Sequence, residues 1–265
     1  MEYTLGFIGC GNMGGALAQA ASKQLSGDKI ALCDFNKEKV NALQAAFGGV
    51  AARSQEIAAK AKFVVLAVKP QMMEGAIAEF SEILRKRTDV VVITMAAGLS
   101  IAAIRGFVGK DLPVIRIMPN TPAMLGAGMI LYATDEVSET DERDFLTAFA
   151  AAGEFDKIPE SDIDAASVVS GCGPAFVYAF IQALADGGVA CGVDSEKAIL
   201  YAAQTAKGAA EMLLKYKDSQ TLIKNVCSPG GTTIEGVKTL EKENLKGVVA
   251  DAVQASYKRT LELKK

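Results

Sequence analysis

The sequence predicts an α/β protein in which a doubly wound parallel sheet is followed by an all-helical domain. Three observations favour this class. Continuous apolar runs alternate with helical stretches in the first half of the chain, which is typical of parallel strands buried on both faces. A glycine-rich turn follows the first of these runs. After about residue 159 only helical spacing of apolar residues remains, so the predicted domains are 1–159 and 160–265.

The elements follow the chain in order. The predicted strands cover residues 3–9, 29–34, 62–68, 89–94 and 113–118, and residues 128–134 and 154–158 are expected to add edge strands. Helices at 37–47 and 72–86 separate earlier strands. Pro159 and the acidic residues after it form a helix-start pattern, which places the boundary at 158–161 without a flexible linker. Helical spacing then covers 174–192, 194–216 and 245–265.

Composition excludes several classes of function. The net charge of −3 and the lack of Trp argue against nucleic acids and anionic membranes as partners. Five cysteines without a CxxC pair, and no signal peptide, favour a reduced cytoplasmic setting. We expect no apolar run of the roughly 18–20 residues that span a bilayer. The chain contains no histidine, which excludes a catalytic His–Asp pair, a Ser-His-Asp triad and zinc ligation by imidazole, and we expect no metal site.

The stretch GFIGCGNMGGAL contains Gly9, Gly11 and Gly14 in G-x-G-x-x-G spacing, directly after a predicted strand and before a helix. In such loops the first glycine permits the tight turn, the second lets backbone approach a pyrophosphate, and the third lets helix and strand pack closely. The helix N-terminus adds amides and a positive dipole. The pattern predicts a Rossmann-type dinucleotide site.

The choice of dinucleotide depends on the end of the second strand. Asp34 could accept hydrogen bonds from a ribose 2′-OH, which favours NADH. Asn36 and Lys37 follow it and could meet a 2′-phosphate, although the same residues fit a helix cap with solvated charges. We predict NADPH as the cofactor, with NADH usable.

Two further segments follow strands at the sheet edge where ligands bind in such folds. Lys69-Pro70 ends one strand abruptly, and Ala96, Ala97 and Gly98 follow the next. These small residues would allow a flat ring to lie against backbone. Beside the glycine loop, both segments are expected to line the cofactor.

Several ordered motifs together resemble the pyrroline-5-carboxylate reductase family over essentially the whole chain. They are GFIGCGNMGGAL, LAVKPQ, AAGLS, RIMPNTPA, SGCGPAF at 170–176 and NVCSPGGTTIEGVKTLE from 225. Cys172 departs from the family, where serine is common. The resemblance implies a helical domain that dimerises, often with further assembly into decamers, and an active site to which the partner subunit contributes. It also implies reduction of 1-pyrroline-5-carboxylate to L-proline, the final step of proline biosynthesis.

The resemblance also implies site residues. Ser228, Gly231, Thr232 and Thr233 would form the substrate pocket, with the carboxylate on backbone amides and hydroxyls and Thr233 near the ring nitrogen as the catalytic residue. Glu160 matches an acidic position near the substrate. The implied cofactor contacts are the nucleotide loop, a position near the adenosine ribose, the two strand ends and a position near the nicotinamide ribose: Gly9, Cys10, Gly11, Asn12, Met13, Gly14, Ser54, Ala67, Val68, Lys69, Pro70, Ala97 and Asn225.

The chemistry agrees with the missing histidine, because a cyclic imine has a basic nitrogen and can bind already protonated. Positioning and shielding then carry much of the catalysis, and Thr233 would orient the nitrogen without acting as a strong acid. One alternative is a β-hydroxyacid dehydrogenase of the same two-domain plan, which needs a catalytic lysine such as Lys207 or Lys224. Another is a dinucleotide sensor without enzymatic activity, which would be expected to have a disrupted substrate loop.

Overall fold

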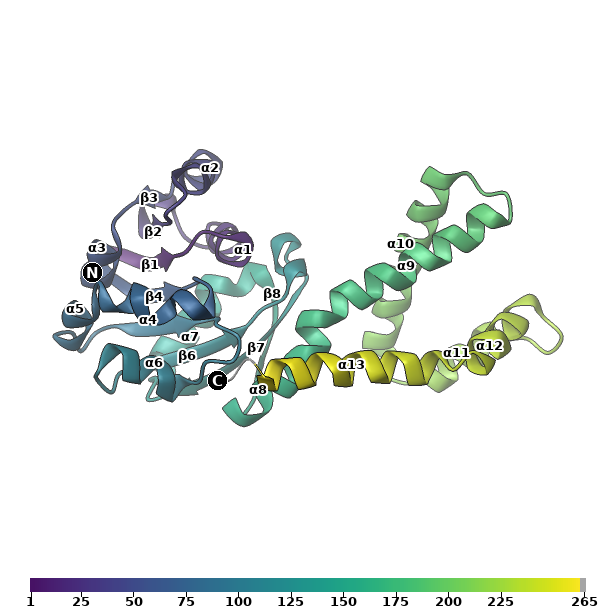
Figure 1. Ribbon diagram of the computed structural model, residues 1–265. Coiled ribbons are helices and arrows are strands. Elements are labelled where there is room, and N and C mark those ends of the chain that lie inside the picture. Colours follow the sequence, from purple (N-terminus) through teal and green to yellow (C-terminus); the bar gives the residue numbers. More distant parts are fainter. Residues whose placement is uncertain (263–265) are drawn as a thin grey trace. The chain divides into compact units, whose positions relative to one another are not determined.

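The computed structural model describes residues 1–262 and divides the chain into two compact units (Figure 1). The first contains Met1–Cys172 and the segment from Ser256 onward, and the second contains Gly173–Ala255. This division lies about one helix later than the sequence boundary at 159/160, which stays a prediction. The predicted residues 263–265 of the last helix lie outside the described residues.

One eight-stranded sheet forms the centre of the first unit, in the order β3-β2-β1-β4-β5-β6-β7-β8. All pairs from β3 to β6 are parallel, β7 runs antiparallel to β6, and β8 runs parallel to β7. The strand order reverses at β1, which has β2 on one side and β4 on the other, so ligands are expected beside the carboxyl end of β1. The strands are β1 Tyr3–Ile8, β2 Ile30–Cys33, β3 Val50–Ala51, β4 Ala61–Leu66, β5 Val91–Thr94, β6 Val114–Met118, β7 Gly128–Asp135 and β8 Gly153–Lys157.

One sequence expectation about the sheet needs correction, and one strand was not predicted. Residues 128–134 do form a strand, but β7 is an inner strand because β8 pairs beyond it. The other edge is β3, which the sequence did not predict because two residues carry no periodicity.

Apolar strand residues face two hydrophobic clusters on opposite sides of the sheet. Along β4, Phe63 and Val65 belong to one cluster and Val64 and Leu66 to the other, and all four are fully buried. This two-sided burial explains why the strands are continuously apolar rather than alternating. The helices of this unit are α1 Asn12–Ala21, α2 Lys37–Phe47, α3 Ser54–Lys60, α4 Met73–Ala78, α5 Ser81–Arg85, α6 Ile101–Val108, α7 Glu139–Phe149 and α8 Glu160–Ser167.

Residues 72–86 do not form the single helix that their spacing predicts. The helix is broken between α4 and α5, where Phe80 has φ −139° and is 1% exposed. Burial of this aromatic side chain outweighs the helical continuity that local propensity favours.

A buried ion cluster joins α8 to β6. Arg116 of β6 places Nη2 2.5 Å from the Oδ1 atom of Asp164 and Nη1 3.3 Å from the Oε1 atom of Glu160, one turn earlier on α8. The Arg116 and Asp164 side chains are 3% and 5% exposed. A charge pair this deeply buried holds the start of the long helical segment against the sheet.

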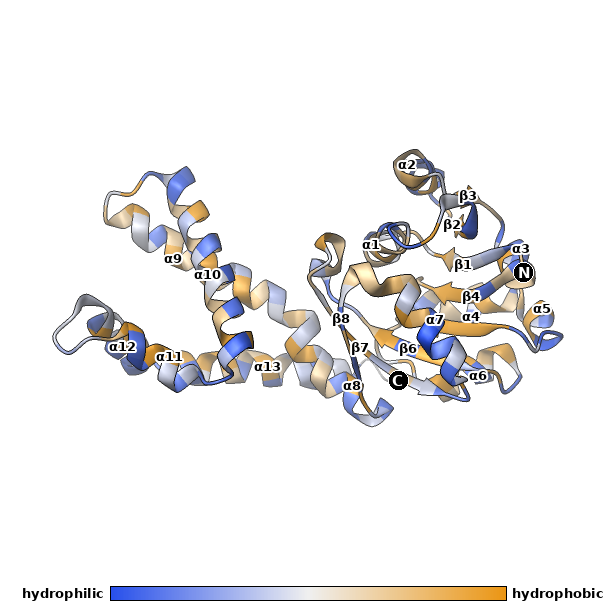
Figure 2. Cartoon of the chain, turned by 180° about the vertical axis from the view of Figure 1, so that it is seen from behind, coloured by the Kyte–Doolittle hydropathy of each residue, from blue (hydrophilic) through white to orange (hydrophobic). Residues whose placement is uncertain are grey.

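The second unit is entirely helical. Its helices are α9 Gly173–Ala190, α10 Ser195–Tyr216, α11 Ser219–Val226, α12 Thr232–Lys242 and the first part of α13 Leu245–Glu262. The α9–α10 pair closes around three buried alanines, Ala185, Ala198 and Ala202. Large apolar side chains elsewhere on these helices are exposed, among them Tyr178 and Leu214 at 60% and 76%. Hydrophobic residues, coloured orange, recur along α9 and α11 in Figure 2.

One helical stretch of the described chain, Glu160–Ala190, is long and apolar enough to cross a membrane, judged by length and composition alone. An 18-residue window within it has a mean hydropathy of 1.6, and 11% of that window is buried. The expectation that no apolar run reaches this length was therefore wrong. Residues 165–185 contain no charge, and their Ser, Gly and Gln residues interrupt the apolar character only weakly.

Candidate nucleotide site and substrate loop

Two glycines of the loop between β1 and α1 have the structural roles that the spacing predicts, and the role of the third stays a prediction. Gly9 has φ +104°, and a Cβ atom there would lie 2.6 Å from the Ala67 carbonyl group. A Cβ atom on Gly14 would lie 2.3 Å from the Gly9 oxygen, whereas a Cβ atom on Gly11 would meet nothing within 4 Å. Gly9 and Gly14 are therefore required by the fold itself, and Gly11 leaves open space through which a ligand can approach the backbone.

Helix α1 presents an uncapped N-terminus to this space. Its N-cap residue is Gly11, which has no side chain to accept from the first amides, and the first turn contains no acidic residue. The orphan N–H groups and the dipole at this end favour an anionic ligand, so the donor set fits the pyrophosphate of a dinucleotide.

The neighbouring strand ends complete the edge around the loop. The Ala67 amide donates to the Ile8 carbonyl group at 2.8 Å, which holds the end of β4 against the end of β1. Lys69 and Pro70 are exposed and begin a 3₁₀ turn, and Ala97 is exposed after β5. These residues lie at the carboxyl edge that the sequence predicts, and their contact with a cofactor stays a prediction.

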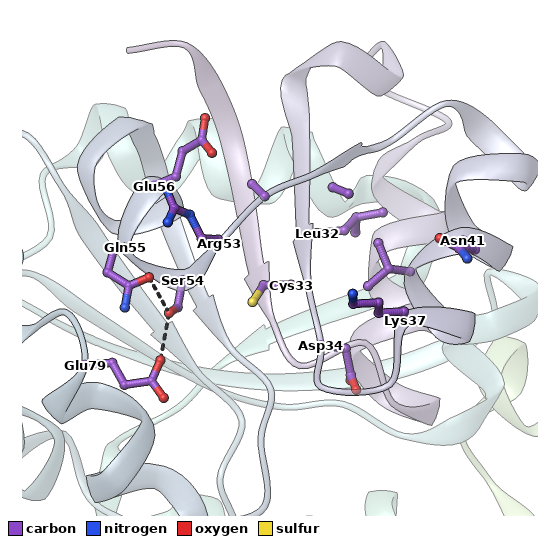
Figure 3. A pocket seen from close by; sticks show the side chains of 13 residues that line it. Leu32, Cys33, Asp34, Lys37, Asn41, Arg53, Ser54, Gln55, Glu56 and Glu79 are labelled. Carbon is purple, nitrogen blue, oxygen red and sulfur yellow. Dashed lines mark hydrogen bonds between the residues drawn. The ribbon is translucent and has the colours of Figure 1, made fainter.

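A cavity of about 530 Å³ opens at the ends of β2 and β3 (Figure 3). It brings together the predicted residues Asp34, Lys37 and Ser54, and a smaller cavity of about 100 Å³ brings together Gly9, Asp34, Ser54 and Val68. Asn12, Met13, Lys69, Pro70 and Ala97 line neither of these two cavities.

Sequence reasoning missed Arg53, Phe35 and Glu79, which line these cavities. Arg53 directly precedes α3 and follows the short strand β3. An interpretation that recognised β3 would have placed Arg53 at the nucleotide edge. Phe35 directly follows Asp34 and is 82% exposed in the structure. The signal available in the sequence was an aromatic residue next to the acidic residue that ends the second strand.

Cys10 lies inside the glycine loop but contributes backbone rather than a reactive thiol. Its amide donates to Asp34 Oδ2 at 2.7 Å, and its side chain is 4% exposed. Burial, followed by the Asp34 carboxylate, raises the pKa of the Cys10 thiol to about 12. The thiol is therefore neutral at physiological pH.

The stretch NVCSPGGTTIEGV forms the helix–loop–helix that the sequence predicts. Helix α11 ends at Val226 and α12 begins at Thr232, with Gly230 at φ +70° in the loop. Gly231 is the N-cap of α12 and has no side-chain cap, and a Cβ atom there would lie 2.4 Å from the Ser228 hydroxyl group. The loop therefore exposes helix amides beside hydroxyl groups, a donor set suited to a carboxylate.

Ser228, Thr232 and Thr233 are exposed on this loop, as is Asn225 in the last turn of α11. These residues belong to the second unit, whereas the nucleotide cavities belong to the first. The contact of these residues with a substrate or a cofactor stays a prediction.

The Glu160 carboxylate makes one hydrogen bond to backbone and one ion pair within the first unit. Its Oε1 atom accepts from the Ile101 amide at 2.7 Å, at the start of α6, and lies near Arg116. A carboxylate at this end of a helix is stabilised by the helix dipole. Contact with a substrate stays a prediction for Glu160, whose side chain is 32% exposed.

A π-helical turn, Val168–Cys172, contains the SGC residues that begin the SGCGPAF stretch, and a hydrogen bond joins it to Asn120. The Asn120 Nδ2 atom donates to the Ser170 carbonyl group at 2.9 Å, and its Oδ1 atom accepts from the Met129 amide at 3.0 Å. Turns of this kind occur frequently at functional sites.

Two family models match the chain. The model described as pyrroline-5-carboxylate reductase dimerisation matches residues 160–263, and the model of coenzyme F420-dependent NADP oxidoreductases matches residues 4–98. The first overlaps the helical unit and the second overlaps the nucleotide edge of the sheet.

Two relatives that match this chain over its full length are both named pyrroline-5-carboxylate reductase. The pyrroline-5-carboxylate reductase of Escherichia coli (strain K12) is 38% identical over 270 residues, covering 100% of both chains. That of Pisum sativum is 36% identical over 266 residues, covering 99% of this chain and 96% of the relative.

Solved structures agree with this similarity. A pyrroline-5-carboxylate reductase from Coxiella burnetii is 30% identical, has a TM-score of 0.90 and covers 100% of both chains. A pyrroline carboxylate reductase from Plasmodium falciparum with NADP bound is 30% identical, with a TM-score of 0.86 and coverage of 99% and 98%. Fold, nucleotide loop and full-length identity together place this chain in the pyrroline-5-carboxylate reductase family.

Proposed function

We propose that this protein reduces 1-pyrroline-5-carboxylate to L-proline with NADPH, the final step of proline biosynthesis. The observation that carries the proposal is that the glycine loop and the PGG-TT loop are both intact in a chain 38% identical to a pyrroline-5-carboxylate reductase over its full length. NADH is proposed as a usable second cofactor.

Different residues of this chain bind the substrate carboxylate and orient the ring nitrogen. When bound, NADPH supplies the hydride that reduces the C=N carbon. The amides at the start of α12 and the Ser228 hydroxyl group hold the substrate carboxylate, and Thr233 orients the ring nitrogen. Because a cyclic imine binds already protonated, no strong acid is required, which fits a chain without histidine.

The helical unit is proposed to work as a homodimer. Burial in this unit is confined to alanines of α9 and α10, and the large apolar side chains stay exposed in a single chain. A second copy would cover them, which explains the apolar stretch Glu160–Ala190 without a membrane. We further propose that dimers assemble into decamers and that the protein is cytoplasmic.

The β-hydroxyacid dehydrogenase alternative finds no support in its candidate lysines. Lys207 is exposed and pairs loosely with Glu211 at 3.9 Å on the same helix, and Lys224 is exposed on α11. Both lysines are solvated, whereas catalytic lysines are generally desolvated. The sensor alternative required a disrupted substrate loop, and the loop Cys227–Gly231 is intact.

Cofactor oxidation with pyrroline-5-carboxylate tests the proposed reaction, using NADPH and NADH in parallel and quantifying proline. Controls omit the imine or replace it with a β-hydroxyacid and the oxidised cofactor. Absence of proline formation with either cofactor would overturn the proposal. Sedimentation velocity tests the dimer and the decamer.

A further inference from the structure

The long helical stretch Glu160–Ala190 changes its hydrogen-bond pattern at the π-helical turn Val168–Cys172. Helix α9 begins directly after this turn with Gly173 and Pro174. Proline has no amide hydrogen, so the Ser170 carbonyl group lacks the donor four residues later that an α-helix normally supplies. The turn also lies where the chain passes from the first unit to the second.

The Asn120 side chain supplies a donor at this point. Its Nδ2 atom donates to the Ser170 carbonyl group at 2.9 Å, and its Oδ1 atom accepts from the Met129 amide at 3.0 Å. Asn120 is 9% exposed and directly precedes the 3₁₀ turn Thr121–Leu125, a position from which asparagine commonly caps the following amides. Its side chain makes no such cap here, so it holds a distant turn instead of its own.

Few other contacts fix the conformation of the π-helical turn. Gly171 and Gly173 have no positive φ, and a Cβ atom on either would meet nothing within 4 Å, so the single chain requires neither glycine. Both glycines favour a helix less than alanine would. The Ser170 hydroxyl group is buried without a hydrogen-bond partner among the described residues. Within residues 1–262, Asn120 provides the only side-chain hydrogen bond to this turn from outside the helical stretch.

The Asn120 hydrogen bond joins the turn to the edge of the sheet where ligands are expected. Asn120 follows β6, which runs parallel to β5, β4 and β1, so its carboxyl end lies at the same edge as the glycine loop. The 3₁₀ turn after Asn120 lies against α1, the helix that begins at this loop. A displaced turn would therefore disturb groups at the reacting edge, where small errors of position lower rates strongly.

We propose that Asn120 is a positioning residue, which replaces the donor missing at Pro174 and holds the SGC turn in the geometry that the reaction requires. The inference rests on the proposed function. Asn120 acts through the turn rather than by contact with the substrate, because both polar groups of its side chain are engaged with backbone.

Steady-state kinetics and amide hydrogen exchange of the full-length protein test the inference. Asn120→Asp keeps an acceptor for the Met129 amide but removes the donor to Ser170, and Pro174→Ala restores an amide hydrogen four residues after Ser170. Asn120→Asp is expected to lower kcat/KM for the imine roughly tenfold, as for loss of one buried hydrogen bond, and to accelerate exchange within residues 171–176. Binding of NADPH should change by less than about twofold.

The Pro174→Ala background makes the test specific. There Asn120→Asp is expected to lower kcat/KM by about threefold or less, because the Ser170 carbonyl group has an alternative donor. Ser167→Ala is the matched control, since it removes a hydroxyl hydrogen bond to the Asp164 carbonyl group on the preceding turn and should change neither kinetics nor exchange.

The outcomes separate the role of Asn120 from the proposed function. Equal losses of kcat/KM in the two backgrounds, or unchanged exchange within residues 171–176, would overturn the inference. A lower thermal midpoint with unchanged kcat/KM would show a structural role alone and would overturn it as well. If the wild type forms no proline, the proposed function fails, and the exchange rates of Asn120→Asp in the two backgrounds still decide whether Asn120 fixes the turn.

Discussion

Removing the charge of Asp164 should destabilise the first unit more than any surface substitution. In Asp164→Asn, the Arg116 guanidinium group stays 3% exposed and keeps only Glu160 as a charged partner, at 3.3 Å. The Glu160 side chain is 32% exposed, so solvent screens its charge more strongly than that of Asp164. The perturbation therefore leaves a buried cation incompletely compensated.

The magnitude follows from buried ion pairs in general. Breaking such a pair by removing one partner costs about 3–5 kcal/mol. For a unit of this size each kcal/mol lowers the thermal midpoint by about 2–4 °C, so a fall of roughly 6–20 °C is expected. Arg116 Nε also has no hydrogen-bond partner among the described residues, so the cluster has no spare acceptor at that atom.

Thermal and urea unfolding at fixed protomer concentration measure the effect, because an assembly makes stability concentration-dependent. Asp162→Asn, an exposed carboxylate on the same helix, is the matched control and should cost less than about 1 kcal/mol. The double variant Arg116→Met/Asp164→Leu should recover much of the loss, because it removes both buried charges. A thermal midpoint for Asp164→Asn within about 2 °C of the Asp162→Asn value, equivalent to about 0.5–1 kcal/mol, would refute the reasoning.

Three further predictions concern the two loops. Gly9→Ala should lower the thermal midpoint, because φ +104° and the Cβ contact at 2.6 Å strain the turn. Gly11→Ala should leave the thermal midpoint unchanged but weaken NADPH binding by roughly tenfold or more. Equal thermal midpoints for the two variants would contradict this prediction. Thr233→Ala should lower kcat/KM at all pH values without changing the shape of the pH profile, and Thr233→Ser should restore most of it; full activity in Thr233→Ala would exclude an orienting role. Because the folded protein raises the pKa of the Cys10 thiol from 9.0 to about 12, its contribution to stability is complete below pH 9 and is lost as pH rises toward 12. Cys10→Ala should therefore show a shallower alkaline decline in thermal midpoint than the wild type, and parallel declines would count against this assignment.

The spacing of apolar residues along the sequence was sufficient to predict most strands and helices of the fold. The runs at 29–34 and 62–68 became β2 and β4, and the helix predicted at 37–47 begins at Lys37 and ends at Phe47 as expected. Asn36 explains that agreement, since its side chain caps the Glu38 amide and leaves little freedom in where α2 begins. Two features were not predicted from local pattern. Strand β3 has only two residues, too few to show a period, and the helix break at Phe80 arises from burial of its side chain rather than from local conformational preference.

The residues of the candidate site likewise include some that the sequence could predict and others that it could not. Gly14 was predictable because a Cβ atom there would meet the Gly9 oxygen within the same strand–turn–helix motif, and Gly9 because the tight turn itself requires a positive φ. The close approach of Gly9 to Ala67 depends instead on the neighbouring strand end. Arg53 was not predictable, because it reaches the cavity only through the pairing of β3 with β2. Likewise, nothing in the local sequence shows that Asp34 accepts a hydrogen bond from the Cys10 amide, 24 positions earlier.

The sequence by itself determined the alternation of strands and helices, the glycine loop and the helix break at 227–231, because these depend on interactions between residues close along the chain. Only the tertiary structure decided which strand lies at each edge, which carboxylates neutralise Arg116, and which cations line the cavity beside Asp34. Those features depend on contacts between distant residues, whose free energies are set by burial and charge compensation in the packed protein rather than by local conformational preference.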